Sequence, residues 1–429
     1  MAKKAKHHAD LVIIGNGIAG NSAALAARSR NQEIKITILS KEPHNEYAAG
    51  ALPDYLSGAL EREKVFIKST TDYEANHIEI GLGIPVETID AKNKTIKLGA
   101  KSLTYDKLII ATGSTPLIPP VKGHELPGNF VFKTLADTEA IINYPGSSAV
   151  VVGSGAIGVE AALALKKRGY GEVTIVELMD WIMPKSFDEK PARIMEQLIN
   201  ELGVKILTSE KVTAVQGAEH VTGIETDRNQ LACDVVVWAI GVKPDVDLAK
   251  SVGIELGITG GIAVDEYLQT NIKDIYACGD CIETTDIFSH KPVLNLLWDA
   301  ACKQGKTAGI NCTGGHTSYT GSYGVLLTYI GDIPVLSLGL NASHVEEQDY
   351  KALERVGVKT YQRLVLKGEE IVGLQTIGTL EGSGPILFHL KKGATQAELN
   401  QISSNLAWRT MEPRSALLKS YIDKFTLCN

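Results

Sequence analysis

A glycine pattern that occurs twice constrains the fold of this chain more than any other feature. The first copy is Gly15-Asn16-Gly17-Ile18-Ala19-Gly20, between an apolar run at residues 11–14 and an Ala-rich helix predicted over residues 18–30. The second copy is Gly153-Ser154-Gly155-Ala156-Ile157-Gly158, between an apolar run at residues 149–152 and another predicted helix. Each helix is followed by a β-branched run, which completes a strand–turn–helix–strand unit. Two such α/β folds are therefore predicted, rather than a stacked repeat array.

The spacing of these glycines between a strand and a helix is typical of dinucleotide-binding sites. The first glycine permits a tight turn, the second lets the backbone approach a pyrophosphate, and the third lets the helix pack closely on the strand. The N–H groups at the helix N-terminus can then bind the anion. The alternative is a Gly-rich turn without a ligand, which a single copy would leave open.

A carboxylate that binds the ribose is expected about 20 residues after each Gly-rich turn. In the first copy Ser40 occupies that position, and Glu42 is the nearest substitute. In the second copy Glu177 closes the following strand. Its carboxylate would accept from the ribose hydroxyls and repel a 2′-phosphate, so NADH is predicted in preference to NADPH. The alternative for Glu177 is an exposed glutamate at a strand end.

Composition and charge narrow the classes of protein further. The chain has 429 residues, 44% hydrophobic and 22% charged, as expected of a folded multidomain protein. A net charge of -7 offers no electrostatic footprint for nucleic acid. No apolar run is long enough to span a membrane, so no membrane contact is predicted.

Six cysteines are too few for a disulfide scaffold, and this favours a reducing compartment, which we expect to be the cytoplasm. Cys278 and Cys281 are two residues apart, but one such pair cannot complete a tetrahedral metal site. The histidines show no ligand spacing. No metal site is predicted, and both cysteines are expected to be structural.

Three further segments accompany the two Gly-rich turns. They are Leu108-Ile109-Ile110-Ala111-Thr112-Gly113, Ala239-Ile240-Gly241-Val242-Lys243-Pro244-Asp245 and Ile275-Tyr276-Ala277-Cys278-Gly279-Asp280. On these motifs, in this order, and on Glu160 after the second turn, the chain resembles the FAD-dependent pyridine nucleotide oxidoreductases. These flavoproteins contain two nested dinucleotide folds, and the resemblance spans nearly the whole chain.

The resemblance implies an α/β architecture with two nested Rossmann-like domains and a C-terminal α+β interface domain. The FAD-binding domain is expected at residues 1–115 and 245–316, and the NADH-binding domain at residues 116–244. Residues 317–429 would form the α+β domain, through which the chain could form a homodimer. Short alternating strands after residue 316 fit that prediction, as does a helix with a capping box at Thr395 and Glu398.

The resemblance also implies two sets of cofactor-binding residues. For FAD they are Gly15, Gly17, Ile18, Ala19, Gly20, Ser40, Lys41, Glu42, Ala111, Thr112, Gly113, Gly279, Asp280, Leu297 and Trp298. For NADH, or NAD⁺, they are Gly153, Gly155, Ala156, Ile157, Gly158, Glu177 and Gly241. Asp280 would hold the ribityl chain, and the helix at residues 297–311 would direct its positive end to the flavin. Glu160 would lie near the nicotinamide as a candidate catalytic residue, or it is a plain first-turn glutamate.

A missing thiol distinguishes this chain from other branches of the family. The cysteine of the peroxidase, oxidase and coenzyme A branch would fall at Gly50, so thiol and disulfide chemistry beside the flavin is disfavoured. The resemblance is closest to the branch of rubredoxin and ferredoxin reductases and nitrite-reductase flavin domains. It implies hydride transfer between NADH and FAD, with electron exchange to an iron–sulfur protein, possibly within a larger redox complex. The alternatives are an NADH oxidase that uses O2 and a flavin-bound redox sensor or assembly subunit.

Overall fold

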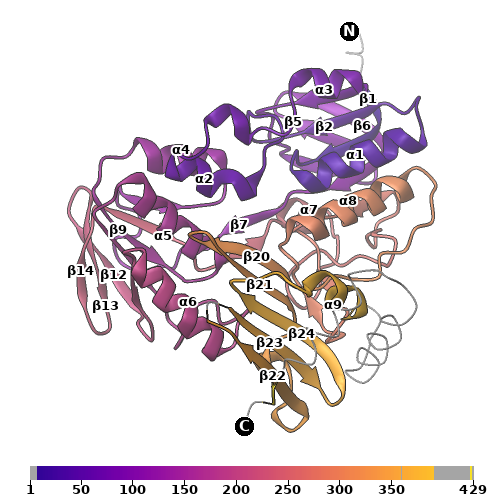
Figure 1. Ribbon diagram of the computed structural model, residues 1–429. Helices are drawn as coiled ribbons and strands as arrows, with labels where there is room; N and C mark the ends of the chain where they lie inside the picture. The colour runs from indigo at the N-terminus through magenta and orange to yellow at the C-terminus, as the bar shows by residue number, and fades with distance from the viewer. Residues whose placement is uncertain (1–6, 359, 391–425, 428–429) are drawn as a thin grey trace. The chain divides into compact units, whose positions relative to one another are not determined.

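A computed structural model describes residues 7–358, 360–390 and 426–427 of the chain (Figure 1). These form two compact units, which we call unit 1 and unit 2. Unit 1 contains residues up to 52, 60–115 and 242–322, and unit 2 contains residues 53–59, 116–241 and those from 323 onward. The capping box predicted at Thr395 and Glu398 lies outside the described residues. The domain boundaries drawn from the sequence stay a prediction.

Unit 1 is built on a seven-stranded sheet with the order β3-β2-β1-β6-β5-β4, in which β17 also pairs with β6. The parallel part contains β1 (His7–Ile14), β2 (Ile36–Leu39), β3 (Ile78–Gly81), β6 (Lys101–Ile110) and β17 (Ile275–Ala277). Strands β4 (Thr88–Asp90) and β5 (Thr95–Leu98) extend it in antiparallel fashion. Because β17 pairs with β6, the chain returns to its first sheet after a long excursion.

Two helices of unit 1 pack side by side along most of their length (Figure 1). They are α1 (Ile18–Arg30), with the bounds predicted from its Ala-rich pattern, and α8 (Trp298–Cys312). A Cβ built on Gly305 would lie 2.1 Å from the Ala19 carbonyl oxygen, and one on Gly309 would lie 2.2 Å from that of Ala23. Glycine is therefore required at both positions for the two backbones to approach so closely.

The remaining elements of unit 1 are short. They are η1 (Ala49–Ala51), η2 (Arg62–Val65), α3 (Thr70–Ala75), β7 (Ser114–Pro116), β16 (Val242–Pro244), α7 (Asp247–Ser251), β18 (Thr284–Thr285) and β19 (Pro292–Val293). Strands β7 and β16 pair with each other where the chain leaves unit 1 and later re-enters it.

Unit 2 contains a five-stranded parallel sheet with the order β11-β10-β9-β15-β8. Its strands are β8 (Asn129–Val131), β9 (Ser148–Val152), β10 (Glu172–Val176), β11 (Lys205–Leu207) and β15 (Val235–Trp238). Helices α4 (Leu135–Asn143) and α5 (Ala156–Arg168) contact this sheet. An antiparallel ribbon of β12 (Val212–Gly217), β13 (Val221–Thr226) and β14 (Gln230–Ala232) precedes β15. The two parallel sheets confirm the predicted α/β class with two Rossmann-like folds.

A second sheet of unit 2 has the order β20-β21-β24-β23-β22-β25 and is antiparallel (Figure 1). Its strands are β20 (Val325–Ile330), β21 (Ile333–Gly339), β22 (Tyr350–Val356), β23 (Tyr361–Lys367), β24 (Glu370–Ile377) and β25 (Thr426–Leu427). The 3₁₀ turns η3 (Ala342–His344) and η4 (Glu347–Asp349) lie before β22, and α9 (Ser383–Leu390) follows β24. Helix α2 (Leu52–Ser57) reaches unit 2 with its residues 53–57.

Helix α6 (Glu189–Glu201) contacts β11 of the parallel sheet and also β20 and β24 of the antiparallel one. The sequence of residues 188–202 predicts a helix with an apolar stripe of Ile194, Met195, Leu198, Ile199 and Leu202. In the structure Met195 and Ile199 are buried, and Ile194 and Leu198 are partly buried. Leu202 was expected on the same stripe, but it is 43% exposed because the helix ends at Glu201 and residue 202 is its C-cap. That part of the prediction is wrong.

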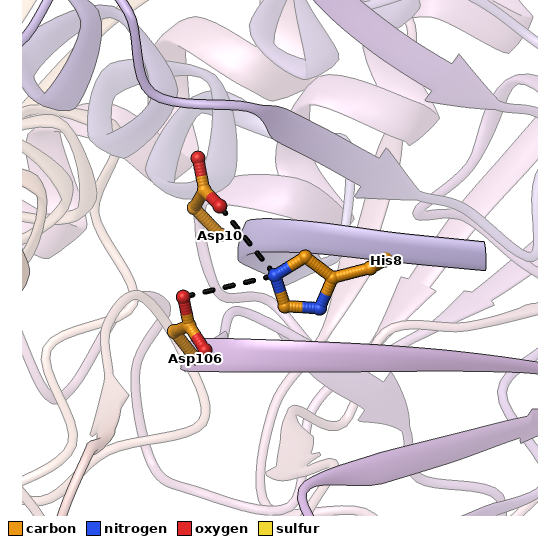
Figure 2. Close-up of side chains that lie close together, drawn as sticks. All are labelled: His8, Asp10 and Asp106. Carbon is orange, nitrogen blue, oxygen red and sulfur yellow. Dashed lines mark ion pairs between the residues drawn. The ribbon is translucent and has the colours of Figure 1, made fainter. Parts of the chain in front are cut away.

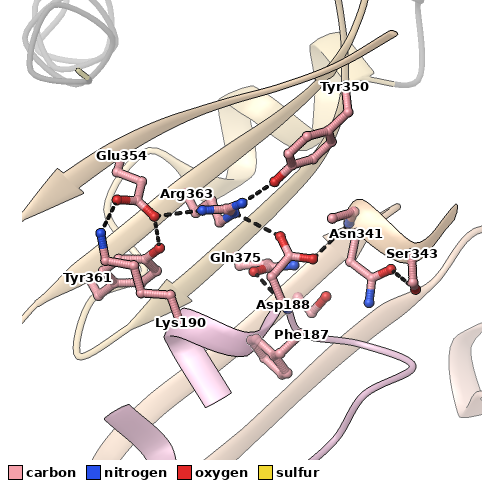
Figure 3. Close-up of polar contacts among 12 residues, drawn as sticks. Phe187, Asp188, Lys190, Asn341, Ser343, Tyr350, Glu354, Tyr361, Arg363 and Gln375 are labelled. Atoms are coloured by element: carbon pink, nitrogen blue, oxygen red, sulfur yellow. Dashed lines mark hydrogen bonds and ion pairs between the residues drawn. The ribbon is translucent and has the colours of Figure 1, made fainter. Parts of the chain in front are cut away.

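Just before α6, a buried group of charges joins the helix to the antiparallel sheet (Figure 3). The Arg363 guanidinium lies 2.7 Å from a carboxylate oxygen of Asp188 and 2.6 Å from one of Glu354, and all three side chains are largely buried. Lys190 and Tyr361 also contact the Glu354 carboxylate. Burial alone would lower the pKa of Arg363, but the Asp188 carboxylate and its other partners raise that pKa above its usual value. Arg363 therefore stays charged and compensates two buried carboxylates.

We expect Arg363→Ala to lower the free energy of unfolding by about 3–5 kcal/mol, because two buried carboxylates would lose their shared cation. Urea unfolding of the purified protein measures the change. Lys351→Ala is the control, because Lys351 on β22 pairs with Glu369 where both side chains are more than half exposed. It should cost less than about 1 kcal/mol. Equal losses in the two variants would contradict the role given to Arg363.

Within the part of the chain that the structure describes, no helix is both long and apolar enough to cross a membrane.

Candidate functional site

The first Gly-rich turn lies between β1 and α1, and each of its three glycines has a distinct environment. Gly15 has a φ of +119°, and a Cβ there would lie 2.0 Å from the carbonyl oxygen of Ala111. A Cβ on Gly20 would lie 2.0 Å from the carbonyl oxygen of Gly15. At Gly17, by contrast, a Cβ would meet no described atom within 4 Å. The outer glycines therefore serve the packing of the turn, and the middle one borders open space.

Gly17 is also the N-cap of α1, and the described residues provide no side-chain hydrogen bond to this helix end. The first turn of α1 contains no acidic residue among them either. Its N–H groups, next to the partly buried Ile18 and the buried Ala19, therefore keep a positive end available to an anion. This geometry suits the pyrophosphate expected from the sequence.

Residues that follow β2 lie beside the first turn, as the spacing suggested. Ser40 is buried, and its hydroxyl accepts a hydrogen bond from the N–H of Glu42 at 3.1 Å. The Glu42 carboxylate accepts from the Tyr47 hydroxyl at 2.8 Å. Lys41 pairs with Asp245 at 3.3 Å, although its own side chain is largely exposed. Glu42 is thus the acidic residue that follows the expected ribose position at Ser40, and Tyr47 already holds one of its oxygens.

The segment after β6 and the segment after β17 are linked by side-chain hydrogen bonds. The Ser114 hydroxyl donates to an Asp280 carboxylate oxygen at 2.7 Å, next to Gly113 with its φ of +76°. Thr112 donates to the carbonyl oxygen of Asp245 at 2.6 Å. The structure therefore brings residues 111–114 together with Asp280. The motif residues were predicted, but the role of Ser114 was not.

Gly279 connects these segments to both helices of unit 1. Its N–H donates to the Gln304 side chain of α8 at 2.8 Å, and a Cβ built on it would lie 2.9 Å from the Ala19 side chain of α1. Helix α8 begins after its N-cap Leu297 with Trp298, which is 54% exposed. Among the described residues no side chain caps this end, but its first turn, unlike that of α1, contains an acidic residue, Asp299, which pairs with Lys303.

A buried polar cluster beside the first turn was not found from the sequence. Lys68 donates to the Asn21 side chain at 2.7 Å and lies 3.0 Å from a carboxylate oxygen of Glu46. The Tyr73 hydroxyl donates to the Asn16 side chain at 3.0 Å. Burial raises the pKa of Glu46, while Lys68 opposes that rise. The cluster fixes the position of Asn16 within the turn, and its residues are too far apart in sequence to signal it.

The second Gly-rich turn, in unit 2, repeats the geometry of the first. Gly153 has a φ of +101°, and a Cβ there would lie 2.5 Å from the carbonyl oxygen of Ala239. A Cβ on Gly158 would lie 2.0 Å from the Gly153 carbonyl oxygen. A Cβ on Gly155 would meet none of the described atoms within 4 Å, and Gly155 is the N-cap of α5.

The rim of the second turn is apolar and open. Ile157 is 50% exposed, next to the partly buried Ala156. Gly241 follows β15 with a φ of +110°, and it too has no described atom where a Cβ would be. The ends of β9, β10 and β15 meet at this edge because the three strands are parallel neighbours. Ligands of such sheets bind at the carboxyl ends of the strands.

Glu177 is nearly buried at the end of β10, with 8% of its surface exposed. One carboxylate oxygen accepts from the N–H and the hydroxyl of Ser154, at 2.8 and 2.5 Å, and the other accepts from the N–H of Met179 at 2.8 Å. The side chain is therefore fixed beside the second turn, and it is not the exposed strand-end glutamate of the alternative. Ser154 was missed in the sequence because its position within the turn accepts many residues.

Glu160 lies on α5, two residues after Gly158, and its carboxylate accepts a hydrogen bond from Thr328. Burial raises the pKa of Glu160, the Thr328 hydrogen bond lowers it, and Asp54 raises it again, so the net direction is upward. A perturbed carboxyl group next to a Gly-rich turn is a candidate for function.

No thiol occurs at position 50, where thiol or disulfide chemistry beside the flavin would need a cysteine. Gly50 lies in η1 and is exposed, and a Cβ there would meet no described atom within 4 Å. Burial raises the pKa of Cys281 to about 11, that of Cys233 and Cys312 to about 12, and that of Cys278 well above its usual value. These four thiols are therefore protonated at neutral pH, and Cys278 and Cys281 are free rather than disulfide-bonded.

Among the described residues, one group of possible metal ligands occurs on the paired strands β1 and β6 of unit 1 (Figure 2). His8 and Asp10 on β1 lie close to Asp106 on the neighbouring β6, with ion-pair distances of 3.5 and 3.7 Å from the histidine. All three side chains are more than a third exposed. Sequence spacing did not reveal the group, because it forms only when the two strands pair. As an exposed ion pair it is ordinary surface structure.

Comparison with known proteins shows which family this chain matches. The family described as pyridine nucleotide-disulphide oxidoreductase matches residues 9–305. An NADH oxidase of Methanocaldococcus jannaschii is 34% identical over 77% of this chain and 76% of its own length. An assimilatory nitrate reductase electron transfer subunit of Bacillus subtilis is 30% identical over 89% of this chain, which spans only 49% of that protein. A NAD-dependent persulfide reductase from A. fulgidus aligns with a TM-score of 0.88 at 29% identity, over 96% of this chain and 83% of that one.

The different environments of the glycines lead to a prediction for the first turn. Gly17→Ala should keep the fold, because its Cβ enters open space, but it should weaken FAD binding about tenfold or more by crowding the pyrophosphate. Gly20→Ala should instead destabilise the protein itself, since its Cβ meets a backbone oxygen. Thermal unfolding without added FAD and FAD titration by fluorescence separate the two effects. Unimpaired FAD binding by Gly17→Ala would refute the placement of the pyrophosphate.

Proposed function

We propose that this chain, which belongs to the pyridine nucleotide-disulphide oxidoreductase family, oxidises NADH and passes the electrons to an iron–sulfur protein. Its family and relatives make it an NAD(P)H oxidoreductase with FAD as its second cofactor. The reverse flow uses the same residues. FAD, when bound, converts between two-electron hydride chemistry and single-electron transfer. The protein supplies binding, orientation and electrostatics.

In this proposal FAD binds unit 1 and NADH binds unit 2. The open N-terminus of α1 and the open space at Gly17 support a pyrophosphate at the first turn. Asp280, oriented by the Ser114 hydroxyl, would accept from a ribityl hydroxyl. At the second turn the N-terminus of α5 would receive the NADH pyrophosphate, and Glu177 would accept from the ribose. Three hydrogen bonds already hold the Glu177 carboxylate, which leaves it about one further acceptor site.

The observation that carries the choice of acceptor is the absence of a cysteine at position 50, where Gly50 stands. Gly50 stands where a cysteine would be needed, and the four buried cysteines of the described residues have raised pKa values. Neither a persulfide nor a disulfide would find a thiolate partner among them. Electrons would then leave the flavin directly, as an iron–sulfur protein allows. The resemblance to an electron transfer subunit of nitrate reductase favours the same exit.

A second candidate is an NADH oxidase that uses O2, which the M. jannaschii relative favours by its name. Both candidates keep the same cofactor sites and differ in the electron exit alone. A flavin-bound redox sensor is the third, and it would turn over slowly with every acceptor.

We expect the FAD-loaded protein, reduced anaerobically by NADH, to be reoxidised by a rubredoxin or ferredoxin at least about tenfold faster than by air-saturated buffer. Stopped-flow absorbance of the flavin measures both rates, and coenzyme A persulfide serves as a third acceptor that should react slowly. Faster oxidation by O2 would establish the oxidase instead. Slow oxidation by every acceptor would favour the sensor.

Glu177→Arg should lower the preference for NADH over NADPH by about 10- to 100-fold, because a cation would replace the carboxylate that we propose to face the 2′ position. Steady-state kcat/KM for the two nucleotides, with a fixed excess of acceptor, measures the ratio. Glu177→Gln is the matched control, since it removes the charge and keeps a side chain able to bond Ser154. An unchanged ratio in the Arg variant would refute the ribose assignment.

A further inference from the structure

The carboxyl group of Glu160 is held by a residue that lies far from it in the sequence. Its Oε1 atom accepts a hydrogen bond of 2.7 Å from the Oγ1 atom of Thr328. Glu160 lies on α5 just after the second Gly-rich turn, and Thr328 lies on β20 of the antiparallel sheet. Both belong to unit 2, and Thr328 is 4% exposed. The contact is therefore part of the interior of that unit.

The strand pattern shows why a hydroxyl at residue 328 is unusual. On β20 the side chains of Leu327 and Tyr329 are 48% and 53% exposed, whereas Thr328 and Ile330 are buried. Thr328 is directly opposite Val335 of β21, which is fully buried. An apolar residue is the usual occupant of such an inward position. The Thr328 hydroxyl is tolerated at this buried position because it donates a hydrogen bond to the Glu160 carboxyl group.

A third segment of the chain acts on the same carboxyl group. Helix α2 is tied to α5 by Arg168, whose guanidinium donates to the carbonyl oxygen of Leu56 at 3.0 Å. The carboxylate of Asp54, on α2, opposes the negative charge of Glu160. Thr328 stabilises that charge, and burial disfavours it. The charged state of Glu160 thus depends on groups from α2, α5 and β20.

We infer that Thr328 is a positioning residue, which fixes the Glu160 carboxyl group beside the second Gly-rich turn for the reaction with NADH. The inference rests on the proposed function, in which NADH binds at that turn. A hydroxyl suits this role in both protonation states of Glu160, because it donates to a carboxylate and accepts from a carboxylic acid. Hydride transfer requires reacting atoms within about 3–3.5 Å, so a side chain that borders the nicotinamide must be held in one place.

Three variants of the FAD-loaded protein test the inference: Thr328→Val, Thr328→Ser and Glu160→Gln. Each is mixed anaerobically with NADH in a stopped-flow instrument between about pH 5 and pH 9, and the limiting rate of flavin reduction is separated from the NADH dissociation constant. Thr328→Val should lower the limiting rate about fivefold to tenfold and change the dissociation constant little. Thr328→Ser should restore the rate.

The pH profile provides a readout that a purely structural role would not move. In Thr328→Val the inflection assigned to Glu160 should shift to higher pH, because the lost hydrogen bond stabilised the charged carboxylate and lowered its pKa. Thr328→Ser should shift it back, and Glu160→Gln should remove it. Thr376→Val is the matched control, since Thr376 is a fully buried threonine of the same sheet whose hydroxyl has no described hydrogen-bond partner. It should leave rate and profile unchanged.

The outcomes distinguish failure of this inference from failure of the proposed function on which it rests. A wild-type rate and profile in Thr328→Val, together with an altered Glu160→Gln, would overturn the role of Thr328 alone. A wild-type Glu160→Gln would remove Glu160 from the reaction, and with it the reason to position it. Failure of NADH to reduce the wild-type flavin would overturn the proposed function itself. If Thr328→Val does not fold, a Thr328→Ser variant with the wild-type rate and profile supports the inference, and one that loses both overturns it.

Discussion

Both units depend on a close contact within their Gly-rich turns, where the third glycine lies against the carbonyl oxygen of the first. Any Cβ on Gly20 or Gly158 would lie 2.0 Å from that oxygen, so the helix can begin only where a side chain is absent. This contact sets α1 on β1 and α5 on β9, with each helix N-terminus at the edge of its sheet. In unit 1 the same principle extends to α8, which Gly305 and Gly309 bring against the backbone of α1. The cofactor sites that we propose would thus follow from backbone packing, and side chains would refine them.

That refinement is mostly the work of hydroxyls that orient carboxylates. Ser114 orients Asp280, Ser154 orients Glu177, Tyr47 binds Glu42, and Thr328 binds Glu160. A hydroxyl donates to an anion without adding charge of its own, so the carboxylates keep their sign for an incoming ligand. The buried ion pair of Arg363 and Asp188 differs, because its opposite full charges neutralise each other and leave no net charge to bind a ligand. The contrast separates the groups that we assign to cofactors from those that join helix to sheet.

Local patterns in the sequence predicted the parts of the molecule that are formed locally. The bounds of α1 are those expected, and both Gly-rich turns lie between a strand and a helix. Contacts between distant residues could not be predicted in this way. The ribbon of β12, β13 and β14 and the strands β21 and β22 were missed, although Gly331-Asp332 between β20 and β21 is a two-residue turn of the kind that joins hairpin strands. Leu202 was placed on a helix stripe because periodicity does not show where a helix ends. The partners of Glu160 and Asp280 were missed because hydrogen bonds across 166 or 168 residues leave no trace in spacing.

The short segment at residues 53–59 has a consequence for how the chain is made. It lies within the first part of unit 1 in sequence, but it belongs to unit 2, whose antiparallel sheet begins only after residue 322. During translation, residues 53–59 therefore emerge from the ribosome long before the residues after 322. They cannot complete their contacts within unit 2 until the rest of that unit has been synthesised. Contacts between such distant residues slow folding and prolong exposure of unfinished surfaces. Biogenesis of this protein is accordingly expected to end with the closure of unit 2, late in translation or after release, when chaperones would matter most.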